Sequence, residues 1–245
     1  MLQLLAILGV LPALLAMFVV DRADAKRPEP RSTLRRIALF GALSTIPAAV
    51  VELIVMHFGP SSDALIGAVF MALMAAVVEE TGKGLVVRWF VWKRPEFDER
   101  TDGIVYGTRA GLGFALLENV CYLLTARSFG GFIAIFLMRA VLTVPMHATA
   151  GGLMGHYAAW RRFEGRGPGV LGGFALAVAI NGGFDACILS LPTLIADDEP
   201  GLALLAGLGA VVIVIGGLVG LRRAWRTALT ADDAASVRAG FAGVA

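Results

Sequence analysis

Charged residues are scarce in this chain of 245 residues. Asp, Glu, Lys and Arg make up only 16% of the sequence, hydrophobic residues make up 58%, and the mean hydropathy is +0.78. Soluble domains carry about 25% charged residues, so the composition excludes an ordinary soluble enzyme. The apolar segments are continuous runs rather than short alternating stretches, which argues against a transmembrane barrel. We therefore expect an all-α, polytopic transmembrane helical bundle.

Cysteine and histidine are also rare. The two cysteines, Cys121 and Cys187, lie inside apolar segments and form no CxxC pair. The sequence has three histidines and no HExxH motif. These absences exclude a disulfide framework, a zinc finger and the helical zinc motif of soluble metalloproteases. We expect both cysteines to have packing roles.

Apolar runs of about 20 residues recur along the whole chain. At ~1.5 Å per residue such a helix crosses a hydrocarbon core of roughly 30 Å. The pattern predicts a single integral membrane domain over residues 1–245, located in the cell membrane and surrounded by the lipid bilayer. About seven spans are predicted, at 1–20, 37–58, 64–92, 103–126, 130–160, 169–195 and 201–221.

Positive charge is distributed unevenly between the predicted loops. Of the 21 Lys and Arg residues, 16 lie in the four segments 21–36, 93–100, 161–166 and 222–238. The loops on the other side have Arg127 as their one basic residue, and one of them carries the acidic run Asp197-Asp198-Glu199. The positive-inside rule then predicts an N-outside, C-inside bundle, closed by a polar tail after residue 221. No nucleic-acid partner is expected.

Three charged side chains interrupt the third predicted span, in Glu79-Glu80-Thr81-Gly82-Lys83. Each costs about 2.5 to 3.5 kcal/mol near the middle of a membrane, so their presence predicts a functional site. Lys83 is four residues after Glu79 and three after Glu80. Because residues at these spacings share a helix face, one ammonium group can contact both carboxylates.

Three other spans carry a stripe of small and polar residues at the same depth, and the motif-bearing core covers about 64–195. The stripes are Gly103, Gly107, Gly111, Ala115 and Glu118-Asn119; Arg139, Thr143, His147, Gly151 and Gly155; and Gly173, Ala177, Asn181 and Asp185. Small residues let neighbouring helices approach closely. Pro145 is expected to break the helix just before His147. Glu52 and His57 lie towards the outer end of their span, where we expect a surface or lining role.

Each stripe alone has a structural explanation: a hydrogen-bonded buried acid, a packing histidine, or an ordinary glycine contact. Together, Glu79, Glu80, Glu118 and Asp185 exceed the charge of Lys83 and Arg139 by two. In a low dielectric such an excess requires protonation, a bound cation or access of water. All three favour a working site.

Carboxylates and a histidine around a wet pocket are suited to activating water. A glutamate takes the proton, and a histidine, a second acid or a metal stabilises the oxyanion. Glu79, Glu80, Glu118 and His147 can supply ligands for a divalent metal such as zinc, although catalytic zinc usually takes three protein ligands that include histidine. A metal-free mechanism stays open. So do a transporter that relays protons or ions through the same carboxylates, and a non-catalytic membrane scaffold.

The sequence resembles the PrsW family of intramembrane proteases, which are distantly similar to the type II CAAX prenyl endopeptidases. The resemblance rests on EExxK at Glu79–Lys83, on GxGFxxxEN at Gly111–Asn119, and on Arg139 followed by Pro145-Met146-His147. It implies an intramembrane endopeptidase, of metallo or glutamic type, that cleaves membrane-anchored regulatory proteins such as anti-sigma factors. The prenyl endopeptidases resemble EExxxR, with a histidine where Glu118-Asn119 stands here, and fit less well.

The resemblance also implies roles for individual side chains. Glu79 is the expected general base, with Glu80 and Lys83 as its charge partners, and Glu79 and Glu80 can exchange roles. Glu118 and His147 are expected to bind metal or to polarise water and the carbonyl group. The supporting residues are Lys83, Asn119, Arg139, Asn181 and Asp185.

The chain departs from the family pattern at Asn181, where the pattern has a histidine four residues before Asn or Asp. An asparagine exchanges no proton near neutral pH and is a poor zinc ligand. This difference favours the metal-free mechanism and leaves a reduced activity open.

Overall fold

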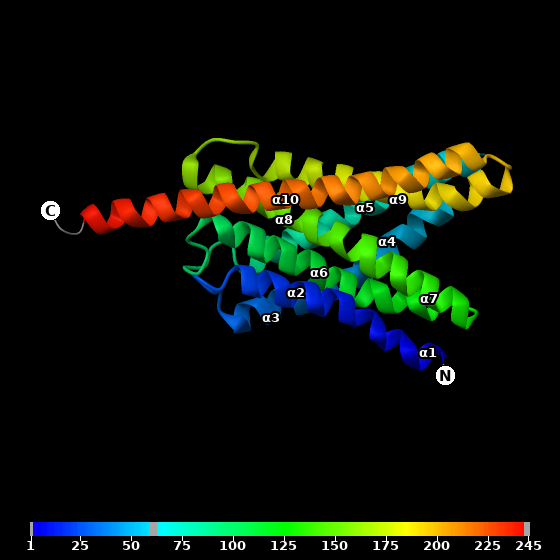
Figure 1. The fold of residues 1–245 in the computed structure, drawn as a ribbon, viewed down its shortest axis with the longest axis horizontal. Helices are drawn as coiled ribbons and strands as arrows, with labels where there is room; N and C mark the ends of the chain where they lie inside the picture. Colours follow the sequence, from blue (N-terminus) through cyan, green and yellow to red (C-terminus); the bar gives the residue numbers. More distant parts are fainter. Residues whose placement is uncertain (1, 59–62, 243–245) are drawn as a thin grey trace.

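The computed structural model describes residues 2–58 and 63–242, and all regular elements in that part of the chain are helical (Figure 1). This confirms the predicted all-α class; the expected loop at 59–62 lies outside the described residues. The α-helices are α1 (Leu2–Leu5), α2 (Val10–Ala23), α3 (Arg31–Leu43), α4 (Thr45–Phe58), α5 (Ala64–Phe90), α6 (Arg100–Leu124), α7 (Phe129–Met138), α8 (Val144–Glu164), α9 (Gly169–Ala196) and α10 (Pro200–Ala242). A 3-10 turn, η1 (Ala6–Gly9), joins α1 to α2, and a π-helical turn, η2 (Arg139–Thr143), joins α7 to α8.

Six helical stretches of the described chain are long and apolar enough to cross a membrane. They are Gln3–Ala23, Arg31–His57, Ala64–Phe90, Phe129–Glu164, Gly169–Ala196 and Pro200–Arg238. The fourth predicted span, 103–126, forms α6, which is a helix as expected but contains Asp102, Arg109 and Glu118 and is therefore less apolar. The number of spans and their orientation stay predictions, as does the single domain over 1–245.

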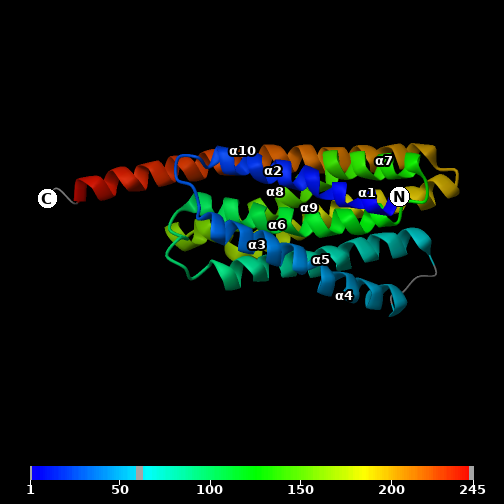
Figure 2. The ribbon, with the colours of Figure 1, turned by 90° about the horizontal axis from the view of Figure 1, so that it is seen from below.

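Helix α6 lies in the middle of the bundle, between α2 and α3 on one side and α8 on another (Figures 1 and 2). Its charged residues have partners on neighbouring helices or connections. Arg109 forms an ion pair with Asp21 at the end of α2, and the hydroxyl of Tyr106 donates to Glu29 in the α2–α3 connection. A helix with this polarity is stable here because other helices, not lipid, surround it.

Glycines bring α6 and α8 into direct backbone contact. A methyl group added to Gly107 would collide with the carbonyl oxygen of Gly151, and one added to Gly155 would collide with that of Gly103. The two predicted stripes of small residues thus face each other. This contact fixes the height of α8 relative to α6.

One local prediction is wrong. Pro145 does not break its helix: it is the second residue of α8, where its missing N–H is not needed, and the π-helical turn precedes it. The polar tail after residue 221 is helical, since α10 continues to Ala242 and extends beyond the other helices (Figure 1). Asp232 holds this extension against α6 by accepting hydrogen bonds from the backbone N–H groups of Arg100 and Thr101, both at 2.9 Å.

Candidate active site

Helix α5 brings three charged side chains together in the interior. The Lys83 Nζ lies 3.0 Å from Glu79 Oε2 and 2.7 Å from Glu80 Oε1. The Lys83 and Glu80 side chains have no exposed surface, and the Glu79 side chain is 5% exposed. The i, i+3 and i, i+4 spacings thus produce a buried ion triplet with one positive and two negative charges.

Asn181 on α9 holds the two carboxylates from the other side. Its Nδ2 donates to Glu79 Oε2 and to Glu80 Oε1, both at 2.9 Å. Two buried oxygens of this group, Glu80 Oε2 and Asn181 Oδ1, have no hydrogen-bond partner within the described part of the chain. Unpaired buried oxygens are costly, so the cluster has acceptors free for a proton donor or a cation.

His147 on α8 links the triplet to α6. Its Nδ1 lies 3.0 Å from Lys83 Nζ, and its Nε2 lies 2.7 Å from Glu118 Oε2. An ammonium group has only donors, so Nδ1 accepts from Lys83 and Nε2–H donates to Glu118. The Phe114 ring, with its centroid 4.2 Å from Lys83 Nζ and 5.4 Å from the imidazole centroid, covers the group.

Arg139 and Asn119 anchor Glu118. The Arg139 guanidinium donates to Glu118 Oε2 at 2.5 Å and, through Nε, to Asn119 Oδ1 at 2.7 Å. Asn119 in turn donates to the backbone carbonyl of Gly9 at 3.0 Å. Arg139 is the first residue of the π-helical turn, and its side chain reaches two residues of α6.

Eight of the nine predicted site residues belong to this connected network; Asp185 is the ninth. Its charge interacts with those of Glu79 and Glu118 at longer range. Glu52 on α4 interacts with the same two carboxylates, although the sequence suggested only a surface or lining role. The sequence feature that could have indicated this role is that Glu52 is an acid inside an apolar run.

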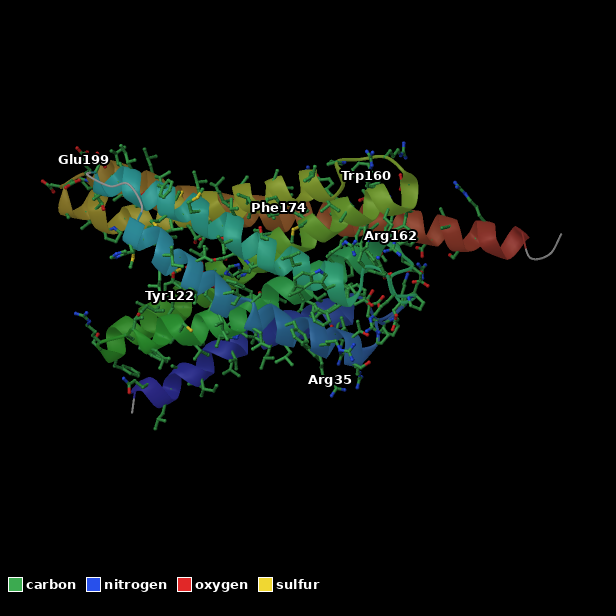
Figure 3. The ribbon with its side chains drawn as sticks, turned by 180° about the vertical axis from the view of Figure 1, so that it is seen from behind. Arg35, Tyr122, Trp160, Arg162, Phe174 and Glu199 are labelled. Atoms are coloured by element: carbon green, nitrogen blue, oxygen red, sulfur yellow. The ribbon has the colours of Figure 1, made fainter. Side chains whose placement is uncertain are left out.

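Two aromatic residues of the site were not predicted. Phe114 covers Lys83. Tyr122, which is labelled in Figure 3, places its ring centroid 4.1 Å from the Arg139 guanidinium. Both lie four residues from Glu118, and this spacing places them on the same face of α6.

Comparison with known proteins adds an independent observation. The family described as "PrsW family intramembrane metalloprotease" matches residues 29–219. The chain belongs to the PrsW family. The matched region includes every predicted site residue, and the resemblance seen in the motifs is confirmed. Together with the apolar helices, membership of this family makes the chain a multi-pass membrane protein.

Several relatives in the family carry the name "Protease PrsW". The chain is 37% identical to that of Geobacillus kaustophilus (strain HTA426) over 161 residues, which are 63% of this chain and 65% of the relative. It is 31% identical to that of Clostridioides difficile (strain 630) over 163 residues, 66% and 67% of the two chains. For Bacillus subtilis (strain 168) the identity is 29% over 157 residues, 64% and 68%. The chain thus spans about two thirds of the length of these relatives, and no solved structure matches it.

The metal in the family's description can be tested against the residues present. Ligand atoms of Glu79, Glu80 and His147 all lie within 4.8 Å of one another. Two carboxylates and an imidazole are a suitable donor set for zinc, and the unpartnered oxygens of Glu80 and Asn181 add acceptors. The residues therefore fit a divalent metal. Glu118 is not in this group, because it bonds to the imidazole nitrogen on the far side.

Proposed function

We propose that this chain is an intramembrane endopeptidase that hydrolyses a peptide bond of a membrane-anchored regulatory protein. The observation that supports it is the buried cluster of Glu79, Glu80 and His147 inside a bundle of apolar helices. Ionisable groups in such surroundings are expensive and are found where function requires them. The family membership supports the same reaction class.

Glu79 is the proposed general base. Its Oε2 is held by Lys83 and Asn181, which leaves Oε1 to take the proton of an attacking water. The water oxygen then bonds to the carbonyl carbon, the C–N bond breaks, and the proton passes to the leaving amine. Lys83 keeps the two adjacent carboxylates from repelling each other.

His147 is the proposed group that polarises the attacking water through Nδ1, and Glu118 is a positioning residue behind it. The Nε2–H to Glu118 hydrogen bond fixes the tautomer, so Nδ1 is directed towards the carboxylates. A carboxylate on the far nitrogen also raises the basicity of an imidazole. Arg139 and Asn119 keep Glu118 in this position, and Asp185 is a supporting residue that interacts electrostatically with Glu79 and Glu118.

Glu79, Glu80 and His147 are the residues that would hold a divalent metal, and such an ion, when bound, supplies a Lewis acid that polarises water or the carbonyl group. A carboxylate has two oxygens, so one that holds a cation still has a second oxygen for a proton. Lys83 Nζ contacts all three residues. The ammonium and a metal therefore share the same acceptors.

The test is cleavage of a membrane-anchored reporter protein by the purified chain in proteoliposomes. Glu79→Gln and His147→Ala should each lower cleavage by at least about 100-fold, the range for loss of a general base or a polarising group. Glu199→Gln, an exposed acid at the α9–α10 connection, is the matched control and should leave cleavage unchanged. Metal content and a chelator series on the same preparation measure the dependence on metal.

Two outcomes would contradict the proposal. Full cleavage by both variants would exclude the assigned residues. Transport of ions without a peptide product would instead identify the transporter alternative. The absence of both cleavage and transport would identify a scaffold.

A further inference from the structure

An apolar cavity of about 380 Å³ lies beside the candidate active site, between α5, α8 and α9. Its walls come from Leu85 and Val87 on α5, Met154 on α8, and Val170 and Phe174 on α9. Figure 3 shows Phe174 between Glu199, at one end of the bundle, and Trp160, near the other. The volume falls in the range of about 300–1,000 Å³ that is typical of ligand cavities.

One end of the cavity is formed by Glu80. This side chain is fully buried, and its Oε2 has no hydrogen-bond partner among the residues that the structure describes. The other end lies at Arg88 and Trp92. Glu80 and Trp92 are twelve residues apart, so the cavity follows α5 for about 18 Å towards the α5–α6 connection.

We infer that the part of this cavity next to Glu80 binds a large apolar side chain, of the size of Leu, Met or Phe, from the membrane-embedded segment of the substrate. The inference rests on the proposed function, since it places that side chain next to the bond that is cut. A segment that spans a membrane consists mostly of apolar residues, which match the walls of the cavity. Glu80 at the inner end joins the cavity to the reacting carboxylates.

Gly84 is the residue that controls the space in the cavity. A Cβ atom at this position would lie 3.6 Å from Met154 Sδ, an ordinary contact, so Gly84→Ala should be accommodated. Gly84 lines the cavity one helical turn after Glu80, and a phenylalanine ring there would occupy the part of the cavity next to Glu80.

The experiment compares cleavage of reporter substrates that differ at one position. Each residue near the cut bond is changed in turn to Ala, Leu, Phe or Asp. The wild-type chain should cleave the Leu and Phe forms of one position about 10-fold or more faster than the Ala form, as kcat/KM, the usual effect of an apolar pocket. Gly84→Phe should abolish this preference, so that the Leu and Phe forms are cleaved no faster than the Ala form.

Control variants separate occupation of the cavity from damage to the fold. Gly84→Ala should keep the preference, and so should Gly216→Phe, at an exposed position of α10 where an added Cβ meets no atom within 4 Å. Phe174→Ala enlarges the cavity without filling it and should shift the preference towards Phe. Thermal unfolding shows that each variant is folded.

An unchanged ranking of substrates in Gly84→Phe would overturn the inference while leaving the proposed function intact. A substrate preference that changes when the acyl-chain length of the lipid is changed would also overturn it, because lipid would then fill the cavity. An equal loss of cleavage for all substrates in a folded Gly84→Phe variant would also overturn it. A wild-type chain that cleaves none of the substrates would refute the proposed function itself, and the inference with it.

Discussion

At the scale of single residues, Lys83 determines how two neighbouring carboxylates are tolerated inside the bundle. It has three donors, and the structure gives each an acceptor: Glu79 Oε2, Glu80 Oε1 and His147 Nδ1. The first two contacts follow from spacing along one helix. The third joins α5 to α8, and it makes the lysine part of the site as well as a counter-charge.

The variant Lys83→Met tests this role. It leaves two adjacent buried carboxylates without their cation, and the expected loss is about 3–5 kcal/mol of unfolding free energy. The double variant Lys83→Met/Glu80→Gln restores the original net charge of the cluster and should recover a large part of the loss. Thermal unfolding in detergent measures both.

Lys93→Met is the control, because Lys93 is exposed beyond the end of α5. It should leave the unfolding temperature unchanged. A Lys83→Met variant as stable as the wild type would show that the ammonium is not needed to balance the carboxylates.

At the scale of helices, α6 accounts for most of the difference between hydropathy and structure. Its charges make it too polar to qualify as a span by composition, yet it forms extensive contacts with α8, α3 and α2. Glycines make this possible, because the two backbones of α6 and α8 touch at Gly107 and Gly151. The close contact also aligns Glu118 with His147.

Gly107→Ala should therefore separate the two helices. The added methyl group has only backbone atoms of Gly151 and Gly155 to displace, and the expected cost is roughly 1–3 kcal/mol, as for other overpacked sites. Thermal unfolding measures the loss. Cleavage should fall with it, because Glu118 and His147 come from the same two helices.

The matched control is Gly207→Ala on α10, where an added Cβ has no atom within 4 Å. Alanine favours a helix over glycine by about 1 kcal/mol, so this variant should be neutral or slightly stabilising. Equal effects of the two substitutions would mean that the α6–α8 contact is less tight than described.

At the scale of the whole molecule, a second group of carboxyls ties the end of the bundle near the α2–α3 connection together. Glu29 accepts from the Tyr106 hydroxyl, and Asp102 accepts from the backbone N–H groups of Asp98 and Glu99 at 2.9 and 2.7 Å. Burial, and then its hydrogen bond with Asp102, raise the pKa of Glu29 to about 9. Burial likewise raises the pKa of Asp24 to about 7.

These shifts predict how stability depends on pH. The folded chain keeps a proton on Glu29 that the unfolded chain releases near its ordinary pKa of 4.5. The unfolding free energy should therefore fall as the pH rises from about 4.5 through about 9. Glu29→Gln keeps a neutral side chain and should give a flatter profile, with a residual slope from Asp24, in thermal unfolding measured across this range. Profiles of equal slope for Glu29→Gln and the wild type would contradict the assignment.

Much of the fold follows from local pattern. The long apolar runs determine the helices, and the spacing of Glu79, Glu80 and Lys83 determines that they share a face, because both depend on the geometry of a single helix. The family motifs pointed to the same residues. The effect of Pro145 was misjudged, and the packing of the tail after residue 221 was not predicted, because the π-helical turn and the contacts of Asp232 depend on neighbouring elements.

The sequence by itself determined the class of the molecule, the helices and the residues that carry its ionisable groups. Only the tertiary structure decided which imidazole nitrogen of His147 faces the carboxylates, that Glu118 lies on its other side, and that an apolar cavity ends at Glu80. The physical reason is that helix periodicity is local, whereas contacts between helices depend on how closely and at what height they pack.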